Sequence, residues 1–127
     1  MPLVTLTVRR PKTPAFKTAV LSGVHAALVA AGVPPADLFH RVIELDAGDF
    51  RFDPRYPDLD RPRGEDFVLI EILLSAGRSV KVKRKLLQDL VAALAKDPGL
   101  DPEGVFVVFK ETAWENWAFG GGRQIHA

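Results

Sequence analysis

The chain has 127 residues, of which 47% are hydrophobic and 26% charged, and 17 Lys and Arg against 16 Asp and Glu leave a formal net charge of +1. This length fits one domain over residues 1–127, and the near-neutral charge excludes attraction to nucleic acid by bulk charge. The lack of cysteine excludes disulfides and thiolate chemistry, and no stretch approaches the roughly 18 consecutive apolar residues that cross a bilayer. We expect a cytoplasmic domain with no membrane or nucleic-acid partner.

The first part of the chain predicts a strand, a helix and a second strand. Residues 3–9 alternate apolar and polar side chains, which is the two-residue period of a strand. Thr13 followed by Pro14 indicates a helix start, because the hydroxyl caps free N–H groups and proline fits the first helical position. Apolar residues at every fourth position extend this helix to Gly32, and residues 40–46 predict the second strand.

The second part repeats that order after a polar connector. Residues 47–66 are rich in proline, glycine and both charge signs, which is typical of a connector, and a short hairpin within it is one option. Residues 67–75 form a nearly continuous apolar run, as in a strand covered on both faces. Ser79 caps a second amphipathic helix that ends at Asp97, and residues 105–111 predict the fourth strand.

These elements form two consecutive β-α-β units, residues 1–46 and 67–111, joined by the connector and followed by a tail, residues 112–127. Because parallel crossovers are right-handed, we predict an α+β fold in which a four-stranded mixed sheet has both helices on one face. The last two strands are too apolar to leave the other face in water. We therefore expect that face to be buried against identical subunits around a symmetry axis.

Common cofactor and metal motifs are missing. The sequence contains no G-x-G-x-x-G after a strand, no P-loop, no G-x-S-x-G and no pair of histidines at ligand spacing. The basic residues between 81 and 85 flank the apolar stripe of the second helix and are interpreted as a solvated face. His25, His40 and His126 have no recognisable partners and are interpreted as packing or surface residues. We expect no cofactor and no metal.

Pro2 is the residue that points to chemistry. Removal of Met1, expected before a proline, exposes a secondary amine, and the pKa of such an amine approaches neutrality when it is desolvated or lies near a cation. If the two β-α-β units pack antiparallel, the starts of the first and second strands and the end of the third meet at one sheet edge. Pro2, Asp37 and Arg78 lie at these three places.

Four segments of the chain match one known family. They are Met1-Pro2-Leu3, Val33-Pro34-Pro35-Ala36-Asp37, Arg78-Ser79 and Trp117-Ala118-Phe119-Gly120-Gly121-Gly122-Arg123. Together they resemble the tautomerase superfamily, and within it the malonate semialdehyde decarboxylase group. The resemblance implies that Pro2 is the catalytic amine and that Asp37 positions water and keeps the amine charged. It also implies that Arg78 binds the carboxylate of a small oxo-acid substrate, with Trp117 and Phe119 as an apolar wall, in a homotrimer.

One departure from the family pattern affects the reaction. Family decarboxylases have Arg-x-Arg before the second helix, whereas this chain has Ala76 in place of the first arginine. A single guanidinium still binds a carboxylate through two N–H groups, but the loss of the second cation favours the charged form of the amine.

The role of the amine stays open between two kinds of chemistry. A charged amine polarises a 3-oxo acid during decarboxylation or hydration, and a neutral amine interconverts the keto and enol forms of a 2-oxo acid. We place the first ahead of the second. The alternative from another class is a non-catalytic trimer that binds a small ligand or a protein partner, which Ala76 favours. Dehalogenation of halogenated acrylates ranks lower, because in the family it uses two arginines.

Overall fold

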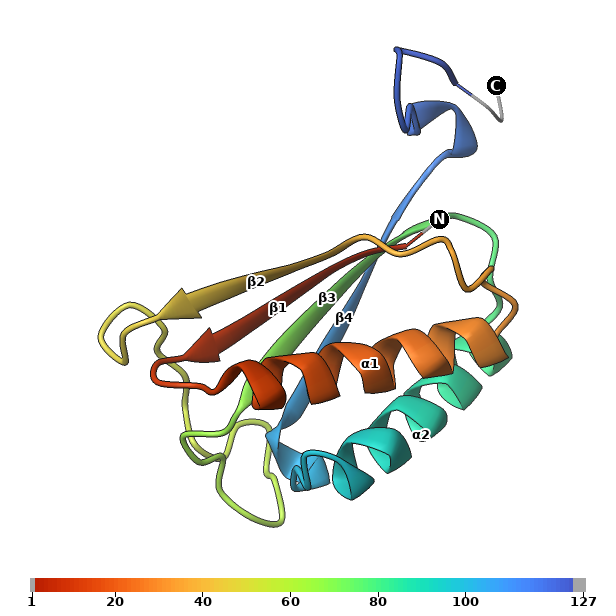
Figure 1. The fold of residues 1–127 in the computed structure, drawn as a ribbon. Helices are drawn as coiled ribbons and strands as arrows, with labels where there is room; N and C mark the ends of the chain where they lie inside the picture. Colours follow the sequence, from red (N-terminus) through yellow and green to blue (C-terminus); the bar gives the residue numbers. More distant parts are fainter. Residues whose placement is uncertain (1, 125–127) are drawn as a thin grey trace.

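The computed structural model describes residues 2–124, and Figure 1 shows a mixed sheet with two helices packed on one face. The strands are β1 (Leu3–Arg9), β2 (His40–Leu45), β3 (Val68–Ser75) and β4 (Val105–Thr112), and the helices are α1 (Pro14–Ala30) and α2 (Val80–Lys96). Two short 3-10 helices, Pro102–Gly104 and Trp114–Asn116, flank β4. The predicted α+β fold is confirmed. No helix in the described part of the chain combines the length and apolar character needed to cross a membrane.

Side-chain caps begin both helices at the predicted residues. The Thr13 hydroxyl accepts a hydrogen bond from the backbone N–H of Phe16 at 3.0 Å, and the Ser79 hydroxyl accepts one from that of Val82 at 3.2 Å. Each bond satisfies one of the N–H groups that the first helical turn leaves free. The strands differ from their predicted ranges by one residue at some ends, where regular pairing gives way to turns.

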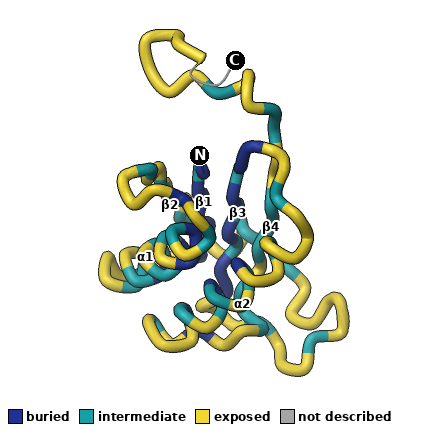
Figure 2. Tube along the Cα trace, turned by 90° about the vertical axis from the view of Figure 1, so that its right-hand side faces the viewer, coloured by how far each residue is buried: buried dark blue, intermediate teal, exposed yellow. Residues whose placement is uncertain are grey.

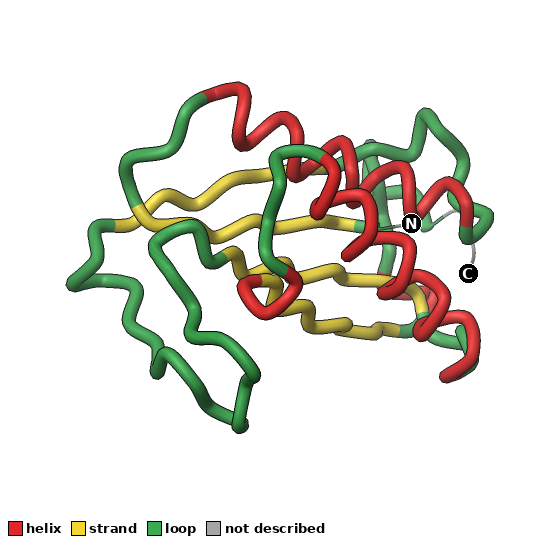
Figure 3. Tube along the Cα trace, turned by 90° about the horizontal axis from the view of Figure 1, so that it is seen from below, coloured by secondary structure: helices red, strands yellow, loops and turns green. Residues whose placement is uncertain are grey.

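The sheet order is β2-β1-β3-β4. β1 pairs parallel with β2, β3 pairs parallel with β4, and β1 and β3 join the two units in antiparallel fashion. Seen from below, in Figure 3, both helices run across the same face of the sheet. The helices approach closely at Gly23, where a Cβ atom would lie 2.9 Å from the Leu94 side chain. The absence of a side chain at Gly23 therefore lets α1 and α2 pack together.

The core lies between the sheet and the helices. Every second residue of the central strands points to the helices and is buried. In β1 Thr5 and Thr7 on the other face are buried as well, and both β1 and β3 are largely dark in Figure 2. These buried strand residues are Val4, Leu6, Val8, Val68, Ile70, Ile72 and Leu74, and the helices contribute Val20, Val24, Leu28, Leu86, Leu90 and Leu94. Burial of these aliphatic side chains is the main stabilising term of the fold.

The opposite face of the sheet has no helix over it. Ile43 of β2 and Phe106 of β4 keep 39% and 44% of their surface exposed there. The connector contains turns and no strand, so a hairpin within it is wrong. Instead its aromatic side chains pack on the sheet end, with the rings of Phe52 and Phe67 4.4 Å apart. Between these rings and the sheet lies a cavity of about 590 Å³.

Candidate functional site

One edge of the sheet gathers four chain segments. Val4, near the start of β1, pairs with His40 at the start of β2, and Ser75 at the end of β3 pairs with Thr112 at the end of β4. The antiparallel pairing of β1 with β3 then brings the two strand starts and the two strand ends to the same side. In Figure 1 the N-terminus and the tail both lie at this edge. We call it the Pro2 edge.

Pro2 lies directly before β1 and is buried, while Leu3, the first residue of β1, pairs with Leu73 of β3. The position of Pro2 is thus set by the pairing of the two central strands. Met1 lies outside the described residues, and its removal stays a prediction.

Asp37 lies in the turn between α1 and β2. Its backbone N–H donates to the carbonyl of Pro34 at 2.9 Å, which closes a four-residue turn, and the residue is half-buried. Two residues later the carbonyl of Phe39 accepts from the backbone N–H of Val4 at 2.9 Å. This bond ties the turn to the start of β1, next to Pro2. The turn that contains Asp37 therefore reaches the edge where Pro2 lies.

Arg78 lies between β3 and the first turn of α2. Gly77 before it has a φ of +123°, a left-handed conformation that side chains disfavour, so glycine suits this sharp exit from the strand. The Arg78 guanidinium donates to the carbonyl of Ser75 at 3.2 Å and is partly buried. Its positive charge adds to the partial positive charge at the start of α2, and both favour an anion at this place.

Glu111, near the end of β4, is an acidic group beside Arg78 to which the sequence analysis assigned no role. Its side chain forms an ion pair with Lys83 of α2. The pKa of the Glu111 carboxyl is lowered mainly by the hydrogen bond from Lys83, with smaller contributions from the Gly77 backbone and the Arg78 charge. The ionised carboxylate therefore offsets part of the positive charge around Arg78.

Three aromatic rings of the tail and the β2 entry lie near one another. Trp117 stacks on Phe119 with ring centroids 5.7 Å apart, and Phe119 contacts Phe39 at the same centroid distance. The indole N–H of Trp114 donates to the carbonyl of Ala76 at 3.2 Å. The tail is thus linked both to the segment after Asp37 and to the loop before Arg78. Phe39 was not predicted as a site residue, and its only signal in the sequence is that an aromatic residue stands two positions after Asp37.

His25 and His40 lie beside the Asp37 turn, with ring centroids 5.5 Å apart in an edge-to-face arrangement. His25 also forms a hydrogen bond through Nε2 to the carbonyl of Pro35 at 2.9 Å. Neither this bond nor the ring contact with His40 could be recognised in the sequence. The pKa of His40 is lowered, first by burial and then by the positive charge of a protonated His25. His126 lies outside the described residues.

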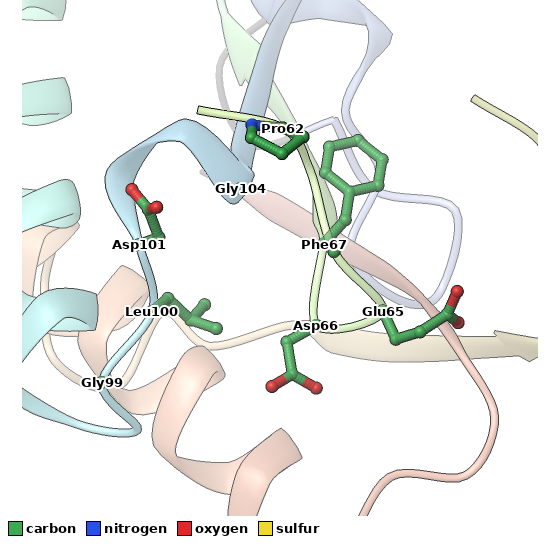
Figure 4. A pocket seen from close by; sticks show the side chains of 9 residues that line it. Pro62, Glu65, Asp66, Phe67, Gly99, Leu100, Asp101 and Gly104 are labelled. Carbon is green, nitrogen blue, oxygen red and sulfur yellow. The ribbon is translucent and has the colours of Figure 1, made fainter. Parts of the chain in front are cut away.

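A cavity of about 400 Å³ lies at the opposite end of the sheet, before β3 and β4 begin, and Figure 4 shows its lining. Each of its three carboxylates pairs with a cation. These pairs are Arg9 with Glu65 at 2.9 Å, Lys12 with Asp66 at 3.6 Å and Arg61 with Asp101 at 2.8 Å. The hydrogen bond from Arg61 lowers the pKa of Asp101 to about 2. Among the described residues no group of three or more His, Asp or Glu side chains is arranged so that it could hold a metal ion.

Comparisons with known proteins identify the family and support the fold. A family model described as "Tautomerase enzyme" matches residues 37–120, more than half of the chain. A malonate semialdehyde decarboxylase, whose structures address decarboxylase and hydratase activities, is 29% identical with a TM-score of 0.88, over 96% of this chain and 93% of that chain. No curated protein sequence matches.

Two further solved structures have the same fold. The FG41 malonate semialdehyde decarboxylase, inhibited by 3-bromopropiolate, is 25% identical with a TM-score of 0.88, over 96% of this chain and 92% of that chain. A fused 4-OT, solved as a symmetric trimer, is 27% identical with a TM-score of 0.75, over 95% and 94% of the two chains.

Proposed function

The chain belongs to the tautomerase family, and from this premise we propose that it is an enzyme whose Pro2 amine acts as a general acid or base on a small oxo acid. The observation that supports this proposal most is the convergence of Pro2, Asp37 and Arg78 at one sheet edge from three different elements. An amine, a carboxylate and a guanidinium are the groups that proton transfer on a carboxylate-bearing carbonyl compound requires.

The substrate carboxylate is assigned to Arg78. A guanidinium donates two parallel hydrogen bonds to a carboxylate, and the start of α2 adds partial positive charge at the same place. Ala76 supplies no second cation, and Glu111 offsets part of the charge around Arg78. Because there are fewer cations nearby, electrostatic repulsion of the charged Pro2 amine is weaker. The negative charge of the Asp37 carboxylate also favours the charged amine.

A charged amine fits decarboxylation or hydration of a 3-oxo acid better than tautomerisation of a 2-oxo acid. The Pro2 ammonium would donate a hydrogen bond to the C3 carbonyl oxygen. The bond between the carboxylate carbon and C2 then breaks, CO₂ leaves, and the electron pair forms an enolate whose oxygen the ammonium stabilises. A proton added at C2 gives the aldehyde product. In hydration, Asp37 would orient the attacking water.

The tail and a trimer would complete the site. Trp117 and Phe119, extended by Phe39, would form an apolar wall, and exclusion of water strengthens the electrostatic effect of the ammonium on the enolate. The sheet face without a helix, on which Ile43 and Phe106 remain partly exposed, supports a homotrimer, the assembly of the fused 4-OT relative. The trimer and a cytoplasmic location are predictions.

The test begins with the intact mass of the untagged protein. We expect the mass to be short by one methionine, and CO₂ release from 3-oxopropanoate to exceed ketonisation of 2-oxo-acid enols. Pro2→Ala should lower kcat by about 10²- to 10⁴-fold, the usual contribution of a general acid or base. Pro54→Ala, at an exposed connector position, is the matched proline control and should leave kcat unchanged. Equal turnover by Pro2→Ala on every oxo acid would falsify the proposal.

The second candidate is a non-catalytic trimer that binds a small ligand or a protein partner. The exposed Ala76 favours it, because one carboxylate anchor suffices for binding whereas orientation for reaction gains from two. A full-length mass, with the Pro2 nitrogen blocked as an amide, together with no turnover would place this candidate first.

A further inference from the structure

A histidine on α1 contacts the turn that contains Asp37. The Nε2 atom of His25 lies 2.9 Å from the carbonyl oxygen of Pro35. A carbonyl only accepts hydrogen bonds, so Nε2 carries the hydrogen and donates it. The bond joins the fourth turn of α1, whose other face is packed into the core, to the Pro34-Pro35-Ala36 part of the loop that follows this helix. It fixes the loop against a rigid element.

Asp37 lies midway between this bond and a second anchor. Two residues before it, the Pro35 carbonyl accepts from His25, and two residues after it, the Phe39 carbonyl accepts from the Val4 backbone. Between them the Asp37 N–H closes the turn on the Pro34 carbonyl. The backbone of Asp37 is therefore restrained on one side by α1 and on the other by β1, the strand that Pro2 precedes.

The His25 side chain makes this contact with one nitrogen. Its Nδ1 atom is buried and has no hydrogen-bond partner among the described residues. His40 contacts the ring edge to face, and a cavity of about 330 Å³ lies beside both rings. Removal of the Nε2 donor would leave Pro35 without this bond, and the cavity gives the turn room to move.

We propose that His25 is a positioning residue for Asp37, which holds the Asp37 turn against α1 through the Pro35 carbonyl. Its effect on turnover rests on the proposed function, in which Asp37 acts beside the Pro2 amine. A displacement of the Asp37 carboxylate by about 1 Å is enough to slow such a reaction substantially. Arg78, on a separate element, still binds the substrate, so the displacement affects kcat more than KM.

The test separates the hydrogen bond from the packing of the ring. His25→Phe keeps a planar ring against His40 and removes the donor, whereas His25→Gln loses the ring and keeps an amide N–H donor. Ser22→Ala, an exposed substitution one turn earlier on α1 and beside the same cavity, is the matched control. His25→Leu is a second variant without a donor, in case His25→Phe does not fold.

Two measurements are made on each full-length variant. Hydrogen exchange at the Asp37 amide reports the turn directly, without any substrate. We expect His25→Phe to speed this exchange about 5-fold, the factor that loss of one hydrogen bond implies, with His25→Gln and Ser22→Ala close to wild type. In steady-state kinetics His25→Phe should lower kcat about 10-fold with little change in KM, and His25→Gln should restore it.

Each of the other possible outcomes would contradict one part of the proposal. Unchanged Asp37 exchange in His25→Phe, or equal acceleration in His25→Phe and His25→Gln, overturns the assignment of the hydrogen bond. Faster exchange with an unchanged kcat, in an enzyme that Pro2→Ala inactivates, overturns the positioning role. If wild type shows no turnover that depends on Pro2, the proposed function fails and the catalytic role of His25 fails with it. The exchange data still decide whether His25 holds the turn.

Discussion

The two ends of the sheet use charged side chains differently. At the end where β3 and β4 begin, the carboxylates of Glu65, Asp66 and Asp101 each pair with a cation from another segment. At the Pro2 edge the Arg78 guanidinium donates to a neutral backbone carbonyl, and aromatic rings of the tail lie nearby. Paired charges at one end hold the connector in place, whereas a guanidinium on a neutral partner can still bind an anion. The carboxylates around the cavity shown in Figure 4 are therefore already paired, and the chemistry is expected at the opposite end of the sheet.

The largest difference between the two ends is expected when one arginine is removed from each of them in turn. Arg78→Ala should lower kcat/KM for a 3-oxo acid about 100-fold, because a charge-assisted bidentate contact is lost. Arg61→Ala, which breaks the exposed pair with Asp101, should leave kcat/KM unchanged. Steady-state kinetics on both variants checks the comparison. Equal losses in the two variants would mean that the ends do not differ in function.

A smaller effect is expected for the pH dependence of stability at the Pro2 edge. The pKa of His40 in the folded chain is below the ordinary histidine value of 6.5. As the pH falls, His40 is therefore protonated in the unfolded chain before it is protonated in the folded chain. The contribution of His40 to the free energy of unfolding is therefore fully present above pH 6.5 and decreases below that pH. Urea denaturation midpoints of His40→Gln should fall less than those of wild type between pH 7.5 and 5.5. Parallel curves would contradict this assignment.

The smallest effect is expected at the opposite end, in more acid solution. The folded pKa of Asp101 is about 2, below its ordinary value of 3.8, so its contribution is present above pH 3.8 and disappears as the pH falls toward 2. Because the pair with Arg61 is exposed, the contribution is small. The difference in denaturation midpoint between wild type and Asp101→Asn should vanish between pH 4 and pH 2. A difference that persists at pH 2 would show that the ion pair is not its source.

Several features of the fold are predictable because their signals are local. Thr13 before Pro14 and the Ser79 hydroxyl are helix caps that act within three residues, and both helices begin at the residues these caps predict. The apolar periods identify the buried face of each element, and two β-α-β units in series predict the mixed sheet. Strand ends shift by a residue because pairing there competes with turn geometry. The hairpin in the connector was wrong: the connector contains turns and no strand, and its Phe52 ring packs against Phe67 at the start of β3, a contact that depends on the tertiary fold.

From the sequence, the candidate site could be predicted only as a set of chain segments, without the contacts between their side chains. Strand order places Pro2, Asp37 and Arg78 at one edge, and this follows from the antiparallel packing of the two units. Their roles remain proposals. The contact of His25 with Pro35 has no sequence signal, because its acceptor is a backbone carbonyl that every residue has.

By itself the amino-acid sequence determined the elements of this protein, their buried faces and the family resemblance, because caps, periods and motifs act over short spans of chain. The tertiary structure decided which side chains meet. Phe39 contacts Phe119, and Glu111 pairs with Lys83, across 80 and 28 positions of chain. Such contacts depend on strand register and on the path of the tail, which only the packed sheet and helices define.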